Sequence, residues 1–299
     1  MPDYLPHFRT SEGEAAYRLA YQRTLALWPP NCRSIDVMTQ FGLTHLTCLG
    51  DPADPPLLML HGFGFSSVQW YPNAPILAAD FCIYAPDVPD QLGLSQLVKP
   101  LQTPENYALW VAELLDALAI PSTPIVGHSY GGWLAANFAL RFPQRVTRLT
   151  LISPAATFVP LSWQFFVRGI LGGATHQDWI IYSMVSWMTT LPEVHGLPIV
   201  EQFKIGMKNM AQIPAGFPTV FTQDEFKALT IPVQLIIGDH EVIYTKPPAS
   251  VIETARNLIP HLQVASISGG GHAVTLDQPA LVNAALASFH HLNNEMRVN

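Results

Sequence analysis

The sequence predicts an α/β protein with a mostly parallel central sheet, helices on both faces and a helical cap insertion. Short apolar runs of strand length alternate with helical segments along most of the chain. A Gly-x-Ser-x-Gly motif at residues 127–131 joins one such strand to the helix that follows. The alternation stops between about residues 154 and 227, where large apolar residues gather in helical patterns. These three observations define the class.

The first third of the chain supplies the first helix and the first strands. A helix is expected over residues 17–28, because Pro29 and Pro30 cannot continue it. Gly42 marks the turn of a hairpin. The strands expected in this third are residues 34–41, 44–49, 57–60 and 81–85.

The rest of the chain begins with a well-marked helix over residues 104–118. Thr103 is its expected N-cap, and Pro104 occupies the first helical position. A strand at residues 124–126 leads into the serine motif, and a helix follows at residues 132–140. The later strands are expected at residues 146–152, 233–237 and 263–267, with a helix at residues 250–258.

Residues 155–227 are predicted to form a helical cap inserted into a core of residues 1–154 and 228–299. The segment is dense in aromatic residues and methionine, with proline and glycine interruptions. Phe158 and Trp187 are the candidate substrate-binding residues of this cap. The alternative is a helical subdomain with its own core, because core packing is the usual role of such side chains.

Composition limits the possible partners and compartment. Of 299 residues, 49% are hydrophobic and 12% are charged, which is ample for a large core. The net charge of −7 argues against general affinity for nucleic acid or anionic membrane. The first 14 residues lack the apolar core of a signal peptide, and no long stretch is free of charge and proline. The three cysteines are expected to be reduced thiols of a cytoplasmic protein.

Ser129 is the candidate nucleophile. The sharp strand-to-helix turn of such a motif crowds the backbone, so Gly127 and Gly131 must flank the serine. The turn lifts the hydroxyl above the positive end of the following helix. The alternative is a glycine-rich turn with an incidental serine.

A second glycine-rich turn, residues 61–64, directly follows the strand at residues 57–60. The backbone N–H groups of Phe63 in this turn and of Tyr130 after the serine are expected to form an oxyanion hole. Phe63 serves in this role whatever its side chain, because the donor is its backbone. Read alone, the turn is equally compatible with a plain entry into a helix.

His272 is the candidate general base among 11 histidines. It follows three glycines after the last strand, and ligand sites in open α/β sheets lie at the carboxyl ends of strands. His61 is expected to support its own turn, and His128 to point away from the serine hydroxyl. The histidines near the termini, His7, His290 and His291, are expected in solvent.

The base needs a carboxylate to fix its tautomer and stabilise the imidazolium. Asp239 and Glu241 both follow the strand at residues 233–237. Asp239 comes directly after a glycine, where aspartate commonly stabilises its own turn, and the longer Glu241 reaches further. Spacing alone does not decide between them.

The chain resembles enzymes of the α/β-hydrolase fold over nearly its full length, and is similar to bacterial carboxylesterases of the naproxen-esterase type. The segments that carry the resemblance are residues 27–29, 41–45, 70–73, 153–155, 216–222 and 238–244. In that family the acid aligns with the fourth residue of the Gly-x-x-acid turn, which implies Glu241. One departure lies at residues 87–95, where the pattern of many α/β hydrolases, Asp-x-x-Gly-x-Gly-x-Ser, is not kept. No catalytic residue is assigned to that loop.

The expected activity is hydrolysis of small-molecule carboxylic esters through an acyl-enzyme, with Ser129, Glu241 and His272 as triad. No metal or organic cofactor is expected, because neither metal-ligand spacing nor a dinucleotide fingerprint occurs. Related enzymes of this fold suggest C–C bond hydrolysis, perhydrolysis or acyl transfer as alternatives. A ligand receptor built on a hydrolase fold is the alternative from another class.

Overall fold

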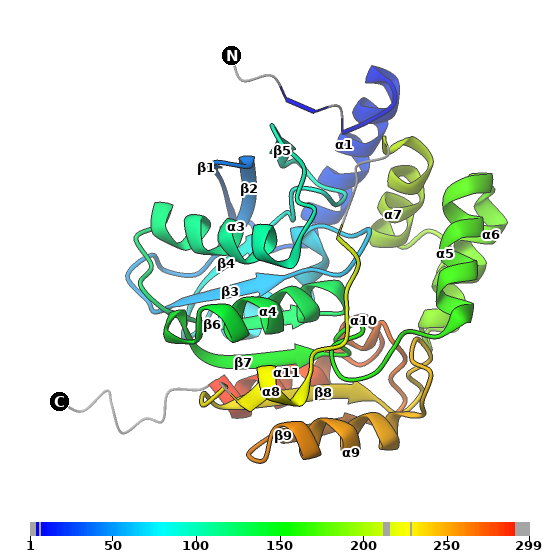
Figure 1. The fold of residues 1–299 in the computed structure, drawn as a ribbon. Helices are drawn as coiled ribbons and strands as arrows, with labels where there is room; N and C mark the ends of the chain where they lie inside the picture. The colour runs from blue at the N-terminus through cyan, green and yellow to red at the C-terminus, as the bar shows by residue number, and fades with distance from the viewer. Residues whose placement is uncertain (1–3, 6, 212–215, 228, 291–299) are drawn as a thin grey trace.

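A computed structural model of the chain describes residues 4–5, 7–211, 216–227 and 229–290. A nine-stranded sheet runs through the molecule in the order β1-β2-β4-β3-β6-β7-β8-β9, with β5 paired to β2 (Figure 1). β1 and β2 pair antiparallel, and so do β2 and β4, whereas every pair from β4 to β9 is parallel. The predicted fold class, a mostly parallel sheet with helices on both faces, is confirmed.

The strands match the expected segments within one or two residues at most ends. Their bounds are β1 Arg33–Thr39, β2 Gly42–Leu49, β3 Pro56–Leu60, β4 Cys82–Pro86, β5 Gln96–Leu97, β6 Thr123–His128, β7 Val146–Ile152, β8 Val233–Gly238 and β9 Gln263–Ile267. The two-residue strand β5 was not anticipated, because so short a segment has no periodicity.

The main helices are α1 Ser11–Leu25, α3 Pro104–Ala117, α4 Tyr130–Arg141, α9 Pro248–Leu258 and α11 Pro279–His290. Shorter ones in the described ranges are η1 Ser67–Trp70, α2 Ala74–Leu77, η2 Pro143–Arg145 and α10 Val274–Asp277. Thr103 caps α3 as predicted, accepting a hydrogen bond from the backbone N–H of Asn106. The predicted start of the first helix is wrong, because Thr10 caps α1 through the N–H of Gly13.

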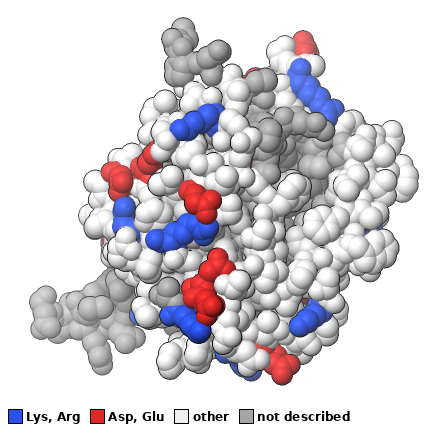
Figure 2. Space-filling model, in the orientation of Figure 1, with Lys and Arg blue, Asp and Glu red and all other residues white. Residues whose placement is uncertain are grey.

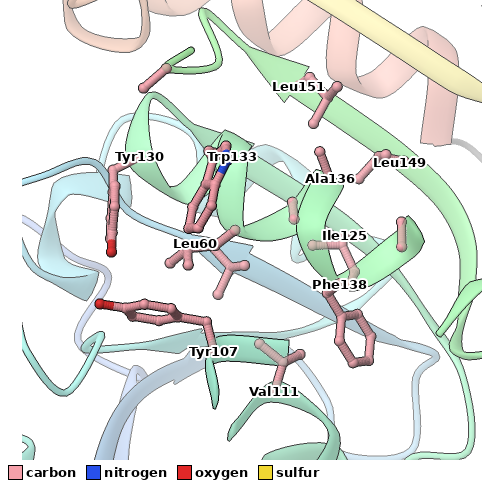
Figure 3. Packing of buried hydrophobic residues seen from close by; sticks show 14 of the residues in the cluster. Leu60, Tyr107, Val111, Ile125, Tyr130, Trp133, Ala136, Phe138, Leu149 and Leu151 are labelled. Atoms are coloured by element: carbon pink, nitrogen blue, oxygen red, sulfur yellow. The ribbon is translucent and has the colours of Figure 1, made fainter. Parts of the chain in front are cut away.

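Alternate residues of the central strands pack into separate cores on the two faces of the sheet. Leu58 and Leu60 of β3 belong to the core beneath α3 and α4, whereas Leu57 and Met59 belong to the core beneath α1 and α11. This period of two is what a strand covered on both faces requires. Figure 3 shows the first core, where Leu60, Ile125 and Leu149 of three neighbouring strands pack with Trp133 and Phe138 of α4.

The described residues between β7 and β8 form four helices: α5 Trp163–Thr175, α6 Asp178–Met188, α7 Pro198–Asn209 and α8 Gln223–Lys227. Helices α5, α6 and α7 gather beyond the carboxyl ends of the parallel strands, whereas α8 lies beside α9 (Figure 1). The face over α5 and α6 carries few charged side chains in Figure 2. The predicted division into core and cap stays a prediction, and its boundary at residue 228 lies outside the described residues. No helix in the described ranges is long and apolar enough to span a membrane.

The expectation that the terminal histidines lie in solvent is wrong for two of them. His290 ends α11 in the interior, where its Nε2 lies 2.8 Å from the Thr150 hydroxyl of β7. The reason is that α11 packs against β8 and β9, which buries its last turn. His7 is also buried, and His291 lies outside the described residues.

The corner between β6 and α4 leaves no space for side chains beside the serine. A Cβ on Gly127 would lie 2.2 Å from the carbonyl oxygen of Gly131, and a Cβ on Gly131 would lie 2.1 Å from that of Leu60. Real Cβ atoms do not approach backbone oxygen so closely, so β3, β6 and α4 meet only because both positions are glycine.

Gly131→Ala is expected to lower the free energy of unfolding by more than 2 kcal/mol, because strand β3 must move to relieve the clash. The control is Gly169→Ala in α5, where an added Cβ meets nothing within 4 Å. This control is expected to gain about 0.5–1 kcal/mol, since alanine favours the helix over glycine. Denaturant titration of both variants measures the effects, and equal stability of the two would contradict the account of the corner.

Candidate active site

Ser129 occupies the corner between β6 and α4 in a conformation that few residues adopt. Its backbone has φ 53° and ψ −115°, outside the regions that L-residues favour. The strand before it and the helix after it hold this conformation, as the motif predicts. The N-terminus of α4 therefore lies directly behind the hydroxyl and favours negative charge there.

His272 joins Ser129 and Glu241 in one line of hydrogen bonds. Its Nε2 lies 2.8 Å from Ser129 Oγ, and its Nδ1 lies 3.0 Å from Glu241 Oε2. All three are buried, although they come from the ends of β6, β8 and β9, far apart in sequence. Parallel strands deliver their carboxyl ends to one edge of the sheet, which brings these residues together.

Glu241 is held as a carboxylate. Burial raises its pKa, but the adjacent His272 and the hydrogen bonds that the carboxylate accepts outweigh this and leave the pKa below its ordinary value. The backbone N–H groups of Val242 and Ile243 both donate to Oε1. An ionised carboxylate only accepts, so the Nδ1 of His272 must carry the proton and its Nε2 is free to accept one from Ser129.

Asp239, the competing acid, contacts other groups. Its Oδ1 accepts a hydrogen bond from the backbone N–H of Gly269 at 2.8 Å and lies 2.7 Å from Nδ1 of His240. Asp239 and His240 both lie at the surface. Asp239 thus joins the end of β8 to the glycine loop, whereas the structure brings Glu241, and not Asp239, to His272.

The loop that carries His272 is tied to the end of α6. The backbone N–H of Ala273 donates to the carbonyl of Met188, and the Thr190 hydroxyl donates to that of Gly269. Asp277 accepts from the Thr189 hydroxyl and from the backbone N–H of Gly271, the latter at 2.7 Å. The base and the helical segment above it are therefore mechanically connected.

The turn at residues 61–64 lies beside the serine, since a Cβ added to Gly62 would lie 3.5 Å from Ser129 Cβ. His61 supports the turn as expected, with its Nε2 accepting from the backbone N–H of Val88. Among the described residues, no hydrogen bond occupies the backbone N–H of Phe63 or that of Tyr130. Two free N–H donors next to a serine hydroxyl suit an oxyanion.

A pocket opens from Ser129 and His272 toward helices α5, α6 and α7. Its walls are mainly apolar side chains, among them Phe165, Met184, Met188, Leu191, Val194 and Phe203. No Asp, Glu, Lys or Arg lines it in the described part of the chain. An apolar wall with a few convergent polar groups is typical of a small-molecule site.

The structure does not bring the two cap candidates to this pocket. Phe158 is buried in the core beneath α4, with its ring stacked on Phe226. Trp187 packs at the edge of that core under the guanidinium of Arg168. Neither is among the described lining residues. Tertiary packing determines which face of a helix turns toward the pocket, so the density of aromatic residues in the sequence does not identify the residues that line it.

Sequence reasoning also missed polar residues that surround the triad. His128, which was expected to point away from the hydroxyl, has its Nε2 3.0 Å from the backbone carbonyl oxygen of His272. Gln69 and Gln91 contact the turn at residues 61–64. Glutamines carry no motif that marks them as functional. No group of three or more His, Cys, Asp or Glu side chains suited to a metal occurs in the described ranges.

The fold and site define a class of protein, and comparison with known families agrees. Residues 55–279 match the model of the alpha/beta hydrolase fold family. The chain belongs to that family.

Two curated relatives come from Bacillus subtilis (strain 168). The chain is 33% identical to an uncharacterized carboxylesterase, nap, over 93% of each chain, and 32% identical to carboxylesterase YbfK over 94% of this chain and 96% of that one. The crystal structure of naproxen esterase (carboxylesterase NP) from Bacillus subtilis superposes with a TM-score of 0.89 at 33% identity, over 95% of this chain and 100% of that one. The chain is therefore similar to carboxylesterases over nearly its whole length.

His128 predicts a specific pH dependence of stability. Burial, with a smaller contribution from the nearby His272, lowers its pKa to about 3. Between about pH 6.5 and pH 3 the side chain is protonated in the unfolded protein, where its pKa is near 6.5, but stays neutral in the folded protein. The free energy of unfolding therefore falls as the pH falls through this range. One proton contributes a slope of about 1.4 kcal/mol per pH unit.

We expect His128→Asn to reduce the slope of unfolding free energy against pH by about that amount between pH 6 and 4. His61, whose pKa burial also lowers, is present in both proteins and cancels in the comparison. Urea titrations at several pH values measure the slopes. Identical slopes would show that His128 is charged in the folded protein or has no lowered pKa.

Proposed function

We propose that this protein is a carboxylesterase that cleaves small apolar esters through an acyl-enzyme on Ser129. The line of hydrogen bonds from Ser129 through His272 to Glu241, opening on an apolar pocket, carries the proposal. The similarity to carboxylesterases at 32–33% identity supports the reaction.

The proposed reaction has two halves. Ser129 Oγ attacks the ester carbonyl while His272 Nε2 takes its proton, and Glu241 stabilises the imidazolium. The backbone N–H groups of Phe63 and Tyr130 hold the oxyanion. His272 then gives the proton to the leaving alcohol, and a water activated by the same nitrogen releases the acid. The scheme requires no cofactor.

The pocket wall suggests the substrate class. The acyl or aryl part of the ester would lie against Phe165, Met184 and Phe203, where no charged side chain among the described lining residues compensates an ionised substrate. The segment at residues 155–227 would act as the cap over this space. We place the reaction in the cytoplasm, a proposal supported by the free thiols of Cys32, Cys48 and Cys82.

The acid assignment is tested by paired amide substitutions. Glu241→Gln is expected to reduce kcat by about 10⁴-fold, because a neutral amide neither fixes the tautomer of His272 nor stabilises its imidazolium. Asp239→Asn keeps the acceptor for Gly269 and is expected to change kcat by less than about tenfold. Steady-state kinetics with an aryl ester and thermal melting of both variants make the measurement. The opposite ranking of the two variants would assign the role to Asp239.

Met184→Ala is expected to shift ester preference, because its side chain forms part of the pocket wall. The added space should raise the kcat/KM for esters with bulky aryl groups by roughly tenfold relative to the kcat/KM for an acetate ester. Phe158→Ala is the control, since Phe158 lies in the core and outside the lining. It should lower the melting temperature and leave ester preference unchanged. A panel of esters of graded size distinguishes these outcomes, and a preference shift in the control alone would contradict the assigned wall.

A further inference from the structure

Two buried glutamines hold the turn that supplies Phe63. The backbone N–H of Gly62 donates to Gln69 Oε1, and that of Gly64 donates to Gln91 Oε1, each at 3.1 Å. Both N–H groups next to Phe63 in sequence are thus occupied, and the Phe63 N–H is the one left free. Gln69 and Gln91 are only 3% and 2% exposed, so water does not compete for these bonds.

Gln69 also reaches the opposite side of the site. Its Nε2 lies 3.4 Å from His128 Nδ1, and His128 Nε2 lies 3.0 Å from the carbonyl oxygen of His272. A carbonyl only accepts, so His128 Nε2 must carry the proton. A buried neutral imidazole then has Nδ1 as its acceptor, which matches the amide N–H₂ of Gln69.

One chain of hydrogen bonds therefore runs from the Gly62 N–H through Gln69 and His128 to the backbone of His272. We propose that Gln69 is a positioning residue of the esterase site, fixing the oxyanion-hole turn and the general-base loop relative to each other. Its carboxamide is suited to this because one end accepts and the other donates. The proposal rests on the proposed function and deepens it.

Gln91 is the matched comparison. It accepts from Gly64 on the other side of Phe63, but its Nε2 turns to Asp90, a carboxylate whose pKa burial raises to about 6. Asp90 in turn accepts from the Tyr107 hydroxyl. Gln91 thus holds the same turn with no link to His128 or His272 among the described contacts, which separates its effect from that of Gln69.

The first experiment measures Gln69→Met, which keeps the length of the side chain and removes both hydrogen bonds. The expected result is a kcat about 10- to 100-fold lower with KM within about threefold, because the hole and base act on the transition state. An aryl trifluoromethyl ketone, which forms a tetrahedral adduct with a serine, should lose affinity by the same factor as kcat/KM. An unchanged kcat with a lower melting temperature would reduce Gln69 to a structural residue.

Double-mutant cycles then distinguish the two glutamines. The fold decrease in kcat of the double variant Gln69→Met, His128→Asn should be smaller than the product of the two single-variant decreases, because both changes break the same chain of hydrogen bonds. For Gln91→Met combined with His128→Asn, the fold decrease in kcat should equal the product of the two single-variant decreases. If the two cycles are equally multiplicative, Gln69 does not act through His128 and the proposal is overturned.

A measurement on the wild type keeps the proposal testable even where Gln69→Met fails to fold. Nitrogen NMR shifts of His128, assigned by their loss in His128→Asn, should report a neutral ring protonated at Nε2 between pH 5 and 8. A ring protonated at Nδ1 would refute the chain. This result does not depend on turnover, so an inactive wild type would refute the esterase function alone, and an active wild type with the wrong tautomer would refute the role of Gln69.

Discussion

The strained corner at Ser129 is the constraint on which the rest of the site depends. Its φ of 53° turns the chain from β6 into α4 within one residue, and it persists because the neighbouring strands leave no alternative. Gly127 and Gly131 let β3, β6 and α4 approach within contact of bare backbone. This close approach also brings the turn after β3 beside the serine. The packing of β3 against β6 and α4 therefore positions both the proposed oxyanion donors and the nucleophile.

A network of buried, hydrogen-bonded polar groups surrounds this corner, next to a pocket with mainly apolar walls. Glu241 is fully buried yet ionised, because His272 and two backbone N–H groups compensate its desolvation. His272 is fixed from three sides: by Glu241, by His128 at its carbonyl, and through Ala273 by the end of α6. Movement of the helices above the pocket would therefore reach the base directly. Rigid positioning of this kind is what transition-state stabilisation requires.

Much of the fold and the central residues were accessible from sequence, for physical reasons. Strands and helices differ in period, and the glycines around Ser129 and before His272 mark places where backbone crowding excludes other residues. Spacing did not decide whether Glu241 or Asp239 is the acid of the triad, because the path of their shared loop determines which carboxylate faces His272. Phe158 and Trp187 were misplaced because apolar content does not tell which helix face meets the pocket. Gln69 and His128 act through contacts made across the fold, and no local pattern marks them.

The most direct test of the account is covalent labelling with a fluorophosphonate, followed by peptide mapping of the adduct. The account predicts one adduct per chain, located on Ser129, with loss of ester hydrolysis in proportion to labelling, and no adduct in Ser129→Ala. An adduct on Ser153 or Ser268, or undiminished labelling of Ser129→Ala, would contradict it.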